Sequence, residues 1–565
     1  MKFSDYAYKR PEFERIKEEQ LRIAERIAGA ATFEEADAAF IENEKLNRSV
    51  ETMATLASIR FTLNTADEFY KAEQDYFDET LPLFQDLNVN VSKTVLASKF
   101  KPDFEKKYGK MLITQLEVAL KRMDPRLIPL MQEENRLSSE YSALTSAMSV
   151  MYQGEECNNY GLLKYMEDKD RDIRRGAFHA WAGWFADNEK KLGEIYDKLV
   201  HLRNEMGKLM GYDTFTPLGY LNMGRTDYGP DDVAKYRDQV VRYIVPVCVE
   251  LRRRQAKRLG LKKLSYFDEQ LLFAGGNADP IGDRDFMVKA ASRMYHEMSK
   301  ETGEFFDFMC EHELMDLDTK PNKAVGGYCT FIPDYDSPYI FSNFNGSAAD
   351  VGVLTHEAGH AFEAFTAARH QPLLSYYWGT SEVCEIHSMS MEFFAYPWLK
   401  LFFGDGVIKN RYAHIMQAIT FIPYGCCVDE YQHIVYQNPD MTPEERTAVW
   451  KKLEAKYMPD RDYDGVEVME KGGFWMQKLH IFTSPFYYID YTLASIGSFE
   501  FFGRMQEDRE RAWSDYYRLC CAGGSQPYLS LLKLANLSNP FEEGAVQRAA
   551  APLIKALEEI DDMSL

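Results

Sequence analysis

The sequence predicts a mainly helical fold with one small sheet, and three observations support this prediction. Apolar residues recur at helical spacing through most of residues 1 to about 320 and again after residue 348. Two short aromatic-rich runs, Tyr328–Ile332 and Tyr339–Phe344, interrupt this pattern. With 565 residues, of which 45% are hydrophobic, the chain can bury a large core.

The N-terminal helices are indicated by amphipathic spacing and by a capping signal. Ile16, Ile23 and Ile27 recur at helical spacing among charged residues within 11–28. Thr32 followed by Glu35 forms a capping box that predicts the start of the next helix. Similar amphipathic runs predict helices over 46–75, 104–122, 126–150, 168–210, 231–258 and 284–314.

The pattern changes near residue 323, where two short strands joined by a turn are predicted immediately before another helix. We expect an N-terminal helical lobe over 1–190 and a catalytic region over 191–565, with an approximate boundary between them. The remaining helices are predicted over 348–369, 379–403, 409–437, 443–456, 485–503, 508–521 and 545–560.

Composition excludes several classes of partner. The chain has 66 basic and 88 acidic residues, a net charge of −22, which argues against nucleic-acid binding. No run of 18 uncharged apolar residues occurs, so no membrane partner is expected. The nine cysteines include no Cys-x-x-Cys pair, and the N-terminus lacks the apolar core of a signal peptide. These features predict a cytoplasmic protein and leave its oligomeric state open.

The segment His356-Glu357-Ala358-Gly359-His360 has the spacing of a catalytic zinc site. On a helix, positions i and i+4 share a face, so both histidines can bind one ion. Glu357 lies beside the first ligand and can act as a general base on a metal-bound water. Two histidines, a carboxylate and a water would form the open tetrahedral site of one Zn²⁺ per chain.

A third protein ligand is required, and spacing alone leaves Glu382, Glu385, His387 and Glu392 as candidates. Glu385 and Glu392 are two helical turns apart and share a face. One of them could bind the metal while the other holds a ligating histidine in place. The metzincin pattern offers no alternative, because the position ten residues after the first histidine is Thr366.

The HEAGH helix followed by Glu385-Ile-His-Ser-Met-Ser-Met-Glu392 resembles the thimet oligopeptidase and oligoendopeptidase F family of zinc metallopeptidases. The resemblance extends over essentially the whole chain and is strongest to the Pz-peptidase-like branch. It implies that Glu385 is the third zinc ligand. It further implies a two-lobed helical ellipsoid with a deep channel for short peptides.

A third block, His480-Ile-Phe-Thr-Ser-Pro-Phe-Tyr487-Tyr488-Ile-Asp-Tyr491, also resembles this family. The resemblance implies that His480, Tyr488 and Tyr491 face the scissile carbonyl. Spacing from the histidine differs slightly from that in thimet-type enzymes, so Tyr487 could replace either tyrosine. Hydrogen-bond donors aimed at the carbonyl oxygen stabilise the charge that develops there.

Several further residues are predicted to support the metal or the substrate. Glu392 and His387 belong to this group because they lie in the second motif. Gly326, Gly327 and Cys329 could lie along a strand edge that binds a substrate backbone. The cluster 429–433 is interpreted as a buried polar network rather than a second metal site or a grip on a peptide amine.

The predicted reaction is hydrolysis of an internal bond in a short peptide. Glu357 would take a proton from the zinc-bound water and pass it to the leaving amine. The Pz-peptidase-like resemblance suggests collagen-derived peptides that contain Gly-Pro.

A zinc carboxypeptidase and an inactive peptide-binding scaffold are the alternative functions. A zinc carboxypeptidase would need a cation for the substrate's C-terminal carboxylate, and the three blocks hold no arginine or lysine assignable to that role. A peptide-binding scaffold without activity is the other alternative, and the intact Glu357 argues against it.

Overall fold

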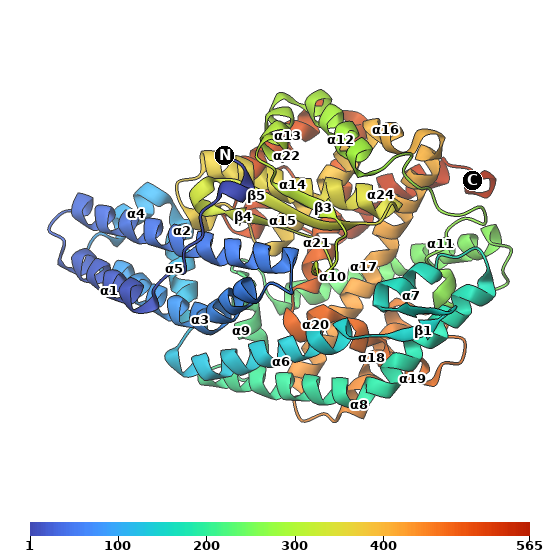
Figure 1. The fold of residues 1–565 in the computed structure, drawn as a ribbon, viewed down its shortest axis with the longest axis horizontal. Coiled ribbons are helices and arrows are strands. Elements are labelled where there is room, and N and C mark those ends of the chain that lie inside the picture. The colour runs from blue at the N-terminus through green and yellow to red at the C-terminus, as the bar shows by residue number, and fades with distance from the viewer.

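The structure is a computed structural model that describes residues 1–565. It contains 24 α-helices and five short strands in two sheets, which confirms the predicted mainly helical fold. Figure 1 shows one group of N-terminal helices, in blue, projecting from a larger body. None of the helices combines the length and the apolar character that a membrane span requires.

The projecting N-terminal group has a hydrophobic core of its own. Its second helix begins as the capping box predicts, because the Glu35 amide donates to Thr32 Oγ1 at 3.3 Å. Leu373 and Tyr376, from the segment that joins two helices of the larger body, also belong to this core. The group comprises α1 (Phe13–Gly29), α2 (Phe33–Leu63), α3 (Glu68–Ala97), α4 (Lys101–Tyr108) and α5 (Lys110–Arg122).

A long helix, α8 (Arg171–Leu209), crosses the lower part of the larger body (Figure 1). Residue 190 lies inside it, so the expected boundary between the lobe and the catalytic region does not fall in a loop, and the division at 190 stays a proposal. The elements around α8 are α6 (Ile128–Ser146), β1 (Val150–Tyr152), β2 (Glu155–Cys157), α7 (Asn159–Tyr165) and α9 (Phe215–Asn222).

The predicted strand pair forms a sheet next to the HEAGH helix, α14 (Ala348–His370). β4 (Tyr328–Ile332) pairs antiparallel with β5 (Ser337–Phe344). A third strand, β3 (Met315–Asp318), which was not predicted, pairs parallel with β5 on its other side. The order β3-β5-β4 leaves β4 at the edge of the sheet. The β1–β2 hairpin forms a second, separate sheet that was not predicted either.

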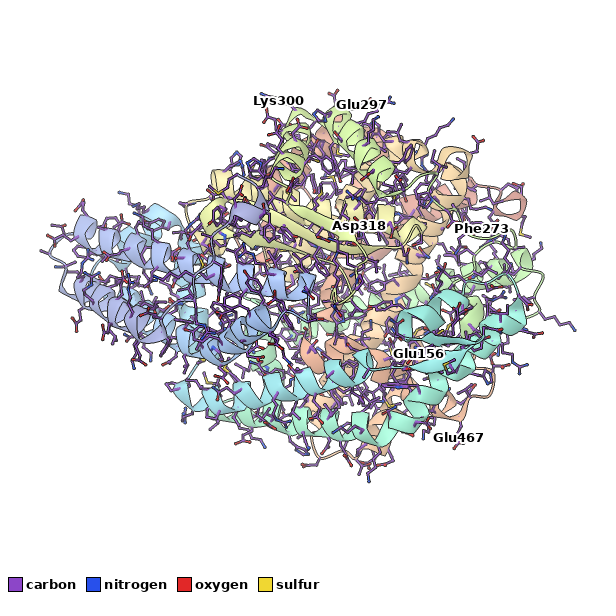
Figure 2. All side chains as sticks on the ribbon, viewed as in Figure 1. Glu156, Phe273, Glu297, Lys300, Asp318 and Glu467 are labelled. Atoms are coloured by element: carbon purple, nitrogen blue, oxygen red, sulfur yellow. The ribbon has the colours of Figure 1, made fainter.

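Helices α14, α15 (Ser381–Phe394), α17 (Val407–Gln437) and α21 (Tyr488–Glu507) form the centre of the body, where α15 packs between α14 and α21. Side chains fill the space between these helices, whereas Glu297 and Lys300 lie on the outer surface (Figure 2). The remaining helices are α10 (Pro230–Tyr243), α11 (Val245–Arg258), α12 (Arg284–Met298), α13 (Lys300–Glu311), α16 (Lys400–Phe403), α18 (Pro443–Tyr457), α19 (Glu467–Glu470), α20 (Leu479–Thr483), α22 (Arg509–Ala522), α23 (Tyr528–Leu534) and α24 (Ala545–Glu558).

Candidate metal centre and active site

Three side chains from two neighbouring helices converge on one point. His356 and His360 come from α14 and Glu385 from α15, and their ligand atoms all lie within 4.8 Å of one another. Glu385 Oε2 is 3.3 Å from His356 Nε2 and 3.5 Å from His360 Nε2. Bonds of about 2.0–2.2 Å in a tetrahedral zinc site separate the ligand atoms by roughly 3.4 Å. The two imidazole nitrogens and the carboxylate oxygen therefore fit a zinc ion.

Gly359 allows the two helices to approach closely. A β-carbon at this position would lie 2.6 Å from Ser388 Cα and 2.8 Å from the His387 carbonyl oxygen, both backbone atoms of α15. Any larger residue would push α15 away from α14. Glycine at the fourth position of the HEAGH segment thus brings Glu385 within reach of the two histidines.

Glu357 lies between the two histidines in sequence and is buried, with 8% of its surface exposed. Burial raises the pKa of this carboxyl group above its ordinary value, which makes it a better proton acceptor. The pKa of Glu385 shifts in the opposite direction. Although burial acts to raise its pKa, the nearby His360 and His356 hold that pKa well below the ordinary value, so this carboxylate stays ionised.

A hydrogen-bonded chain fixes the orientation of His356. Its Nδ1 lies 2.7 Å from Glu392 Oε1, and the other oxygen of Glu392 lies 2.6 Å from His414 Nε2 on α17. His414 Nδ1 is in turn 2.6 Å from the Tyr396 hydroxyl. Burial acts to raise the pKa of Glu392, but hydrogen bonds from His356 and His414 lower it to about 2. The ionised Glu392 therefore accepts a hydrogen bond from the Nδ1–H of His356 and leaves Nε2 free for a metal.

His480 and three tyrosines form an aromatic group beside the metal cluster. The Tyr487 hydroxyl donates to Glu385 Oε1 at 2.8 Å, whereas Tyr488 Oη accepts from Lys478 Nζ at 3.0 Å. The His480 ring stacks on Tyr487, with centroids 5.7 Å apart, and its edge contacts Tyr491 at 5.9 Å. Burial and the charge of Lys478 lower the pKa of His480 to about 4, so its ring is neutral near pH 7 and carries an N–H donor.

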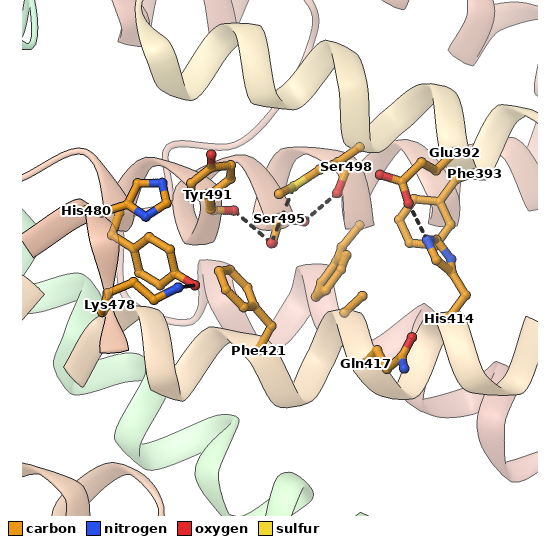
Figure 3. Close-up of a pocket in the computed structure, with 14 residues that line it drawn as sticks. Glu392, Phe393, His414, Gln417, Phe421, Lys478, His480, Tyr491, Ser495 and Ser498 are labelled. Atoms are coloured by element: carbon orange, nitrogen blue, oxygen red, sulfur yellow. Dashed lines mark hydrogen bonds and ion pairs between the residues drawn. The ribbon is translucent and has the colours of Figure 1, made fainter. Parts of the chain in front are cut away.

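His480, Tyr488 and Tyr491, together with Lys478, line a cavity of about 440 Å³ between α15, α17 and α21. Figure 3 shows Lys478 and His480 at one end of it and Glu392 with His414 at the other. Most of the wall between the ends is apolar and comes from Met389, Phe393, Ala418, Phe421 and Phe499.

Two further cavities of about 280 Å³ each continue the first. Lys478 and Phe421 also line one of them, and Glu392 and His414 also line the other. Gln417 on α17 lines all three. The three cavities together therefore follow one face of α17 through the body.

The other predicted residues of the second motif lie away from the metal cluster. Glu382 is fully buried and accepts from the Tyr228 hydroxyl at 3.1 Å. His387 comes two positions after Glu385 and therefore points to another side of α15. It is fully buried, with its Nδ1 3.1 Å from Glu363 Oε2.

The predicted strand edge and the cluster 429–433 lie in different surroundings. Cys329 belongs to the edge strand β4, and the exposed Gly326 and Gly327 precede it. In the cluster, Asp429 pairs with Arg237, and both are buried. The cluster is therefore part of a buried polar network, as the sequence favoured.

Two residues of the site were not predicted from the sequence. His414 lies within a 31-residue helix, 22 positions after Glu392, and no motif surrounds it. Lys478 lies two residues before the third block and belongs to no motif of its own. Its closeness in sequence to His480 is the one signal of its place beside the aromatic group.

Comparison with known families accounts for most of the chain. Residues 3–123 match the Peptidase M3 N-terminal domain, and residues 288–551 match Peptidase family M3. The second match contains the HEAGH helix, α15 and the His480–Tyr491 block.

Solved structures and a curated relative are similar to the chain. PZ peptidase A, in a structure with inhibitor 2, is 45% identical over 100% of both chains, with a TM-score of 0.96. A protein provisionally identified as oligoendopeptidase F is 46% identical over 100% of both chains, with a TM-score of 0.97. Oligopeptidase PepF of Bacillus subtilis strain 168 is 19% identical over 419 residues. That match covers 71% of this chain and spans 59% of the length of PepF.

Proposed function

The chain belongs to peptidase family M3, and from this premise we propose that it is a zinc metallo-oligoendopeptidase that hydrolyses internal bonds of short peptides. One observation supports the proposal above all others. Two imidazole nitrogens and a carboxylate oxygen converge within 4.8 Å beside the buried Glu357. A purely structural cluster would not need a second carboxylate with a raised pKa at its side.

In the proposed site, His356, His360 and Glu385 hold one Zn²⁺ per chain. A zinc ion bound there would supply a Lewis acid that acidifies a water molecule and polarises the peptide carbonyl. Glu392 holds the proton on Nδ1 of His356 by accepting a hydrogen bond from it, so that the ring would present its Nε2 lone pair to the ion. His414 holds the second oxygen of Glu392 and prevents that carboxylate from turning away.

The proton transfers are assigned to Glu357. Its carboxylate takes a proton from the attacking water and then delivers it to the nitrogen of the leaving amine. His480, Tyr488 and Tyr491 donate hydrogen bonds to the carbonyl oxygen as negative charge builds on it. Tyr487 joins this group through its bond to Glu385 and steadies that ligand.

The proposed substrates are oligopeptides whose backbone lies along the edge of β4, next to Gly326, Gly327 and Cys329. Supporting this, β4 has one unpaired edge, and a β-carbon at Gly326 would meet no atom within 4 Å, which leaves room there for another backbone. The resemblance to Pz-type peptidases supports collagen-derived peptides containing Gly-Pro as candidate substrates. A net charge of −22 argues against a nucleic-acid partner. The proposed location is the cytoplasm.

The variant Glu357→Gln tests the proposal. It should retain about one zinc per chain and lose peptidase activity by about 10³-fold or more, because only the proton acceptor is removed. The substrates should be peptides blocked at both ends, with zinc content measured by atomic absorption. Full activity of this variant would contradict the mechanism. Cleavage restricted to peptides with a free C-terminus would instead favour a carboxypeptidase.

A further inference from the structure

Lys478 is a half-buried cation without a carboxylate partner, located in the cavity beside the metal cluster. Its Nζ donates one hydrogen bond, to Tyr488 Oη at 3.0 Å, and lies 4.3 Å from the centroid of that ring. Burial alone accounts for the shift in its pKa, which falls to about 8. No acidic side chain compensates the charge.

Other cations buried in the body are paired with carboxylates. Examples are Arg203 with Glu134, Arg225 with Asp490, Lys323 with Asp316 and Arg461 with Glu269, at 2.6 to 2.9 Å. Removing a charge from water is costly, and a carboxylate partner offsets part of that cost. The chain has 22 more acidic than basic charges, yet none of its carboxylates pairs with Lys478.

The ammonium group retains capacity to bind an anion. It has three N–H donors, and the bond to Tyr488 uses one. Figure 3 shows the Lys478 side chain reaching into the same cavity as His480 and Tyr491. Much of the remaining wall is apolar, so among the side chains at this end of the cavity Lys478 offers the positive charge for an anion that enters.

We propose that Lys478 binds a carboxylate of the peptide substrate and so determines which peptides the site prefers. This inference deepens the proposed oligopeptidase function and rests on it. The carboxylate has two sources, the C-terminus of the peptide or an aspartate or glutamate side chain. The ammonium group recognises the same carboxylate chemistry in both. Tyr488 orients the ammonium group by accepting a hydrogen bond from it.

The test uses two pairs of peptides built on a sequence that the wild-type protein cleaves. One pair differs in a free carboxylate or an amide at the C-terminus. The other pair has an amidated C-terminus and differs in glutamate or glutamine at one position near the cleaved bond. KM and kcat are measured for the wild-type protein and for Lys478→Met, Lys478→Arg and Lys471→Met. Lys471 is an exposed lysine seven residues earlier, paired with Glu189 at 2.7 Å, and serves as the matched control.

We expect the wild-type protein to have a KM about tenfold or more lower for the charged member of one pair. Lys478→Met should remove this preference and leave the neutral peptides within about threefold of wild type. Lys478→Arg should keep the preference, and Lys471→Met should behave as wild type. The pair that responds identifies the source of the carboxylate.

Equal KM values within both pairs for the wild-type protein would overturn the inference. So would an equal loss for charged and neutral peptides in Lys478→Met, because the lysine would then act through Tyr488 alone. Direct binding of the same peptides to Glu357→Gln, followed by fluorescence anisotropy, tests recognition apart from turnover. If the wild-type protein cleaves no peptide, the proposed function fails instead. If it cleaves all four peptides equally, only the carboxylate subsite fails.

The thermal stability of Lys478→Met separates recognition from a structural role. Replacing an unpaired, half-buried charge with an apolar side chain of similar length should leave the melting temperature unchanged or raise it. A large fall would mean that Lys478 supports the fold, and the inference would then be wrong.

Discussion

A hydrogen bond of 2.7 Å joins Nδ1 of His356 on α14 to Oε1 of Glu392 on α15. The other oxygen of Glu392 lies 2.6 Å from Nε2 of His414 on α17. One carboxylate therefore connects three helices at the metal cluster. Both of its oxygens accept hydrogen bonds from imidazole N–H groups. Glu392 therefore fixes the tautomer of His356 that leaves Nε2 free.

Glu392→Gln should weaken zinc binding by about 10–100-fold, because an amide cannot accept from both rings with two oxygens. His414→Asn should have a smaller effect in the same direction. Competition with a chelator of known affinity measures both. His370→Asn, at the exposed C-terminal end of α14, is the control and should bind zinc as the wild-type protein does. Unchanged affinity in Glu392→Gln would mean that the hydrogen bond does not orient the ligand.

Glu385→Gln should reduce zinc affinity by more than about 100-fold, because the amide supplies a much weaker metal ligand. Glu382→Gln is the matched control. This glutamate lies on the same helix and is fully buried, but it contacts Tyr228 instead of the histidines. It should keep close to the wild-type affinity. Equal losses in the two variants, measured by equilibrium dialysis, would contradict the choice of Glu385.

Gly359→Ala should destabilise the protein by about 1–3 kcal/mol and weaken zinc binding as well. The added methyl group would collide with backbone atoms of α15 and force that helix away from α14. Gly352→Ala, on the same helix with no atom within 4 Å of the new β-carbon, should stabilise the protein by about 0.5–1 kcal/mol. Urea denaturation of both variants gives the free energies of unfolding. A neutral Gly359→Ala would show that the helices can separate freely.

Tyr491→Phe should lower kcat by about 10²–10³-fold with little change in KM or zinc content, because it removes a donor to the carbonyl oxygen. Tyr487→Phe should act differently, since its hydroxyl bonds Glu385 at 2.8 Å. We expect this variant to weaken zinc binding as well as to slow turnover. Steady-state kinetics at saturating zinc, together with a zinc titration, separates the two effects. Loss of zinc in Tyr491→Phe would assign it to the metal instead.

The pH dependence of substrate binding should identify Lys478. Burial lowers its pKa to about 8 from 10.5, so the ammonium charge is present below pH 8 and is lost as the pH rises through that value. The KM for the preferred carboxylate peptide should therefore rise about tenfold per pH unit well above pH 8, while the KM of its neutral counterpart stays constant.

The groups that face Lys478 do not titrate in this range. Burial holds the pKa of His480 near 4, and it raises the pKa values of Tyr488 and Tyr424 above 10. In Lys478→Arg the pH dependence should disappear, because a guanidinium group stays charged. A rise in KM for both peptides of the pair would point to a different titrating group.

Local spacing predicted the two histidines of the site, whereas the choice of Glu385 among four candidates and the roles of the His480–Tyr491 block came from the family resemblance. His356 and His360 share a helix face because they are four residues apart, and the same rule places Glu385 and Glu392 on one face of α15. His414 and Lys478 reach the same cavity from segments whose position depends on how distant helices pack. No periodicity in either segment carries that information.

The fold shows the same limit. The run 46–75 was predicted as one helix, but Asn64 ends α2, and Asp67 begins α3 by accepting from the amides of Phe69 and Tyr70. The apolar pattern continues on both sides of this break, so its spacing does not reveal where one helix ends and the next begins. β3 escaped prediction because its four residues include two aspartates, and its pairing partner β5 lies more than twenty residues later.

The position of Leu373 and Tyr376 has a consequence for how the chain can be divided. These side chains come from the connection between the two helices that carry the metal cluster, yet they complete the core of the projecting N-terminal group. A fragment without residues 1–123 would expose both of them to solvent and lose the support for that connection. The projecting N-terminal group is therefore not an interchangeable module, and its replacement in a chimaera would require matching changes in residues 371–380.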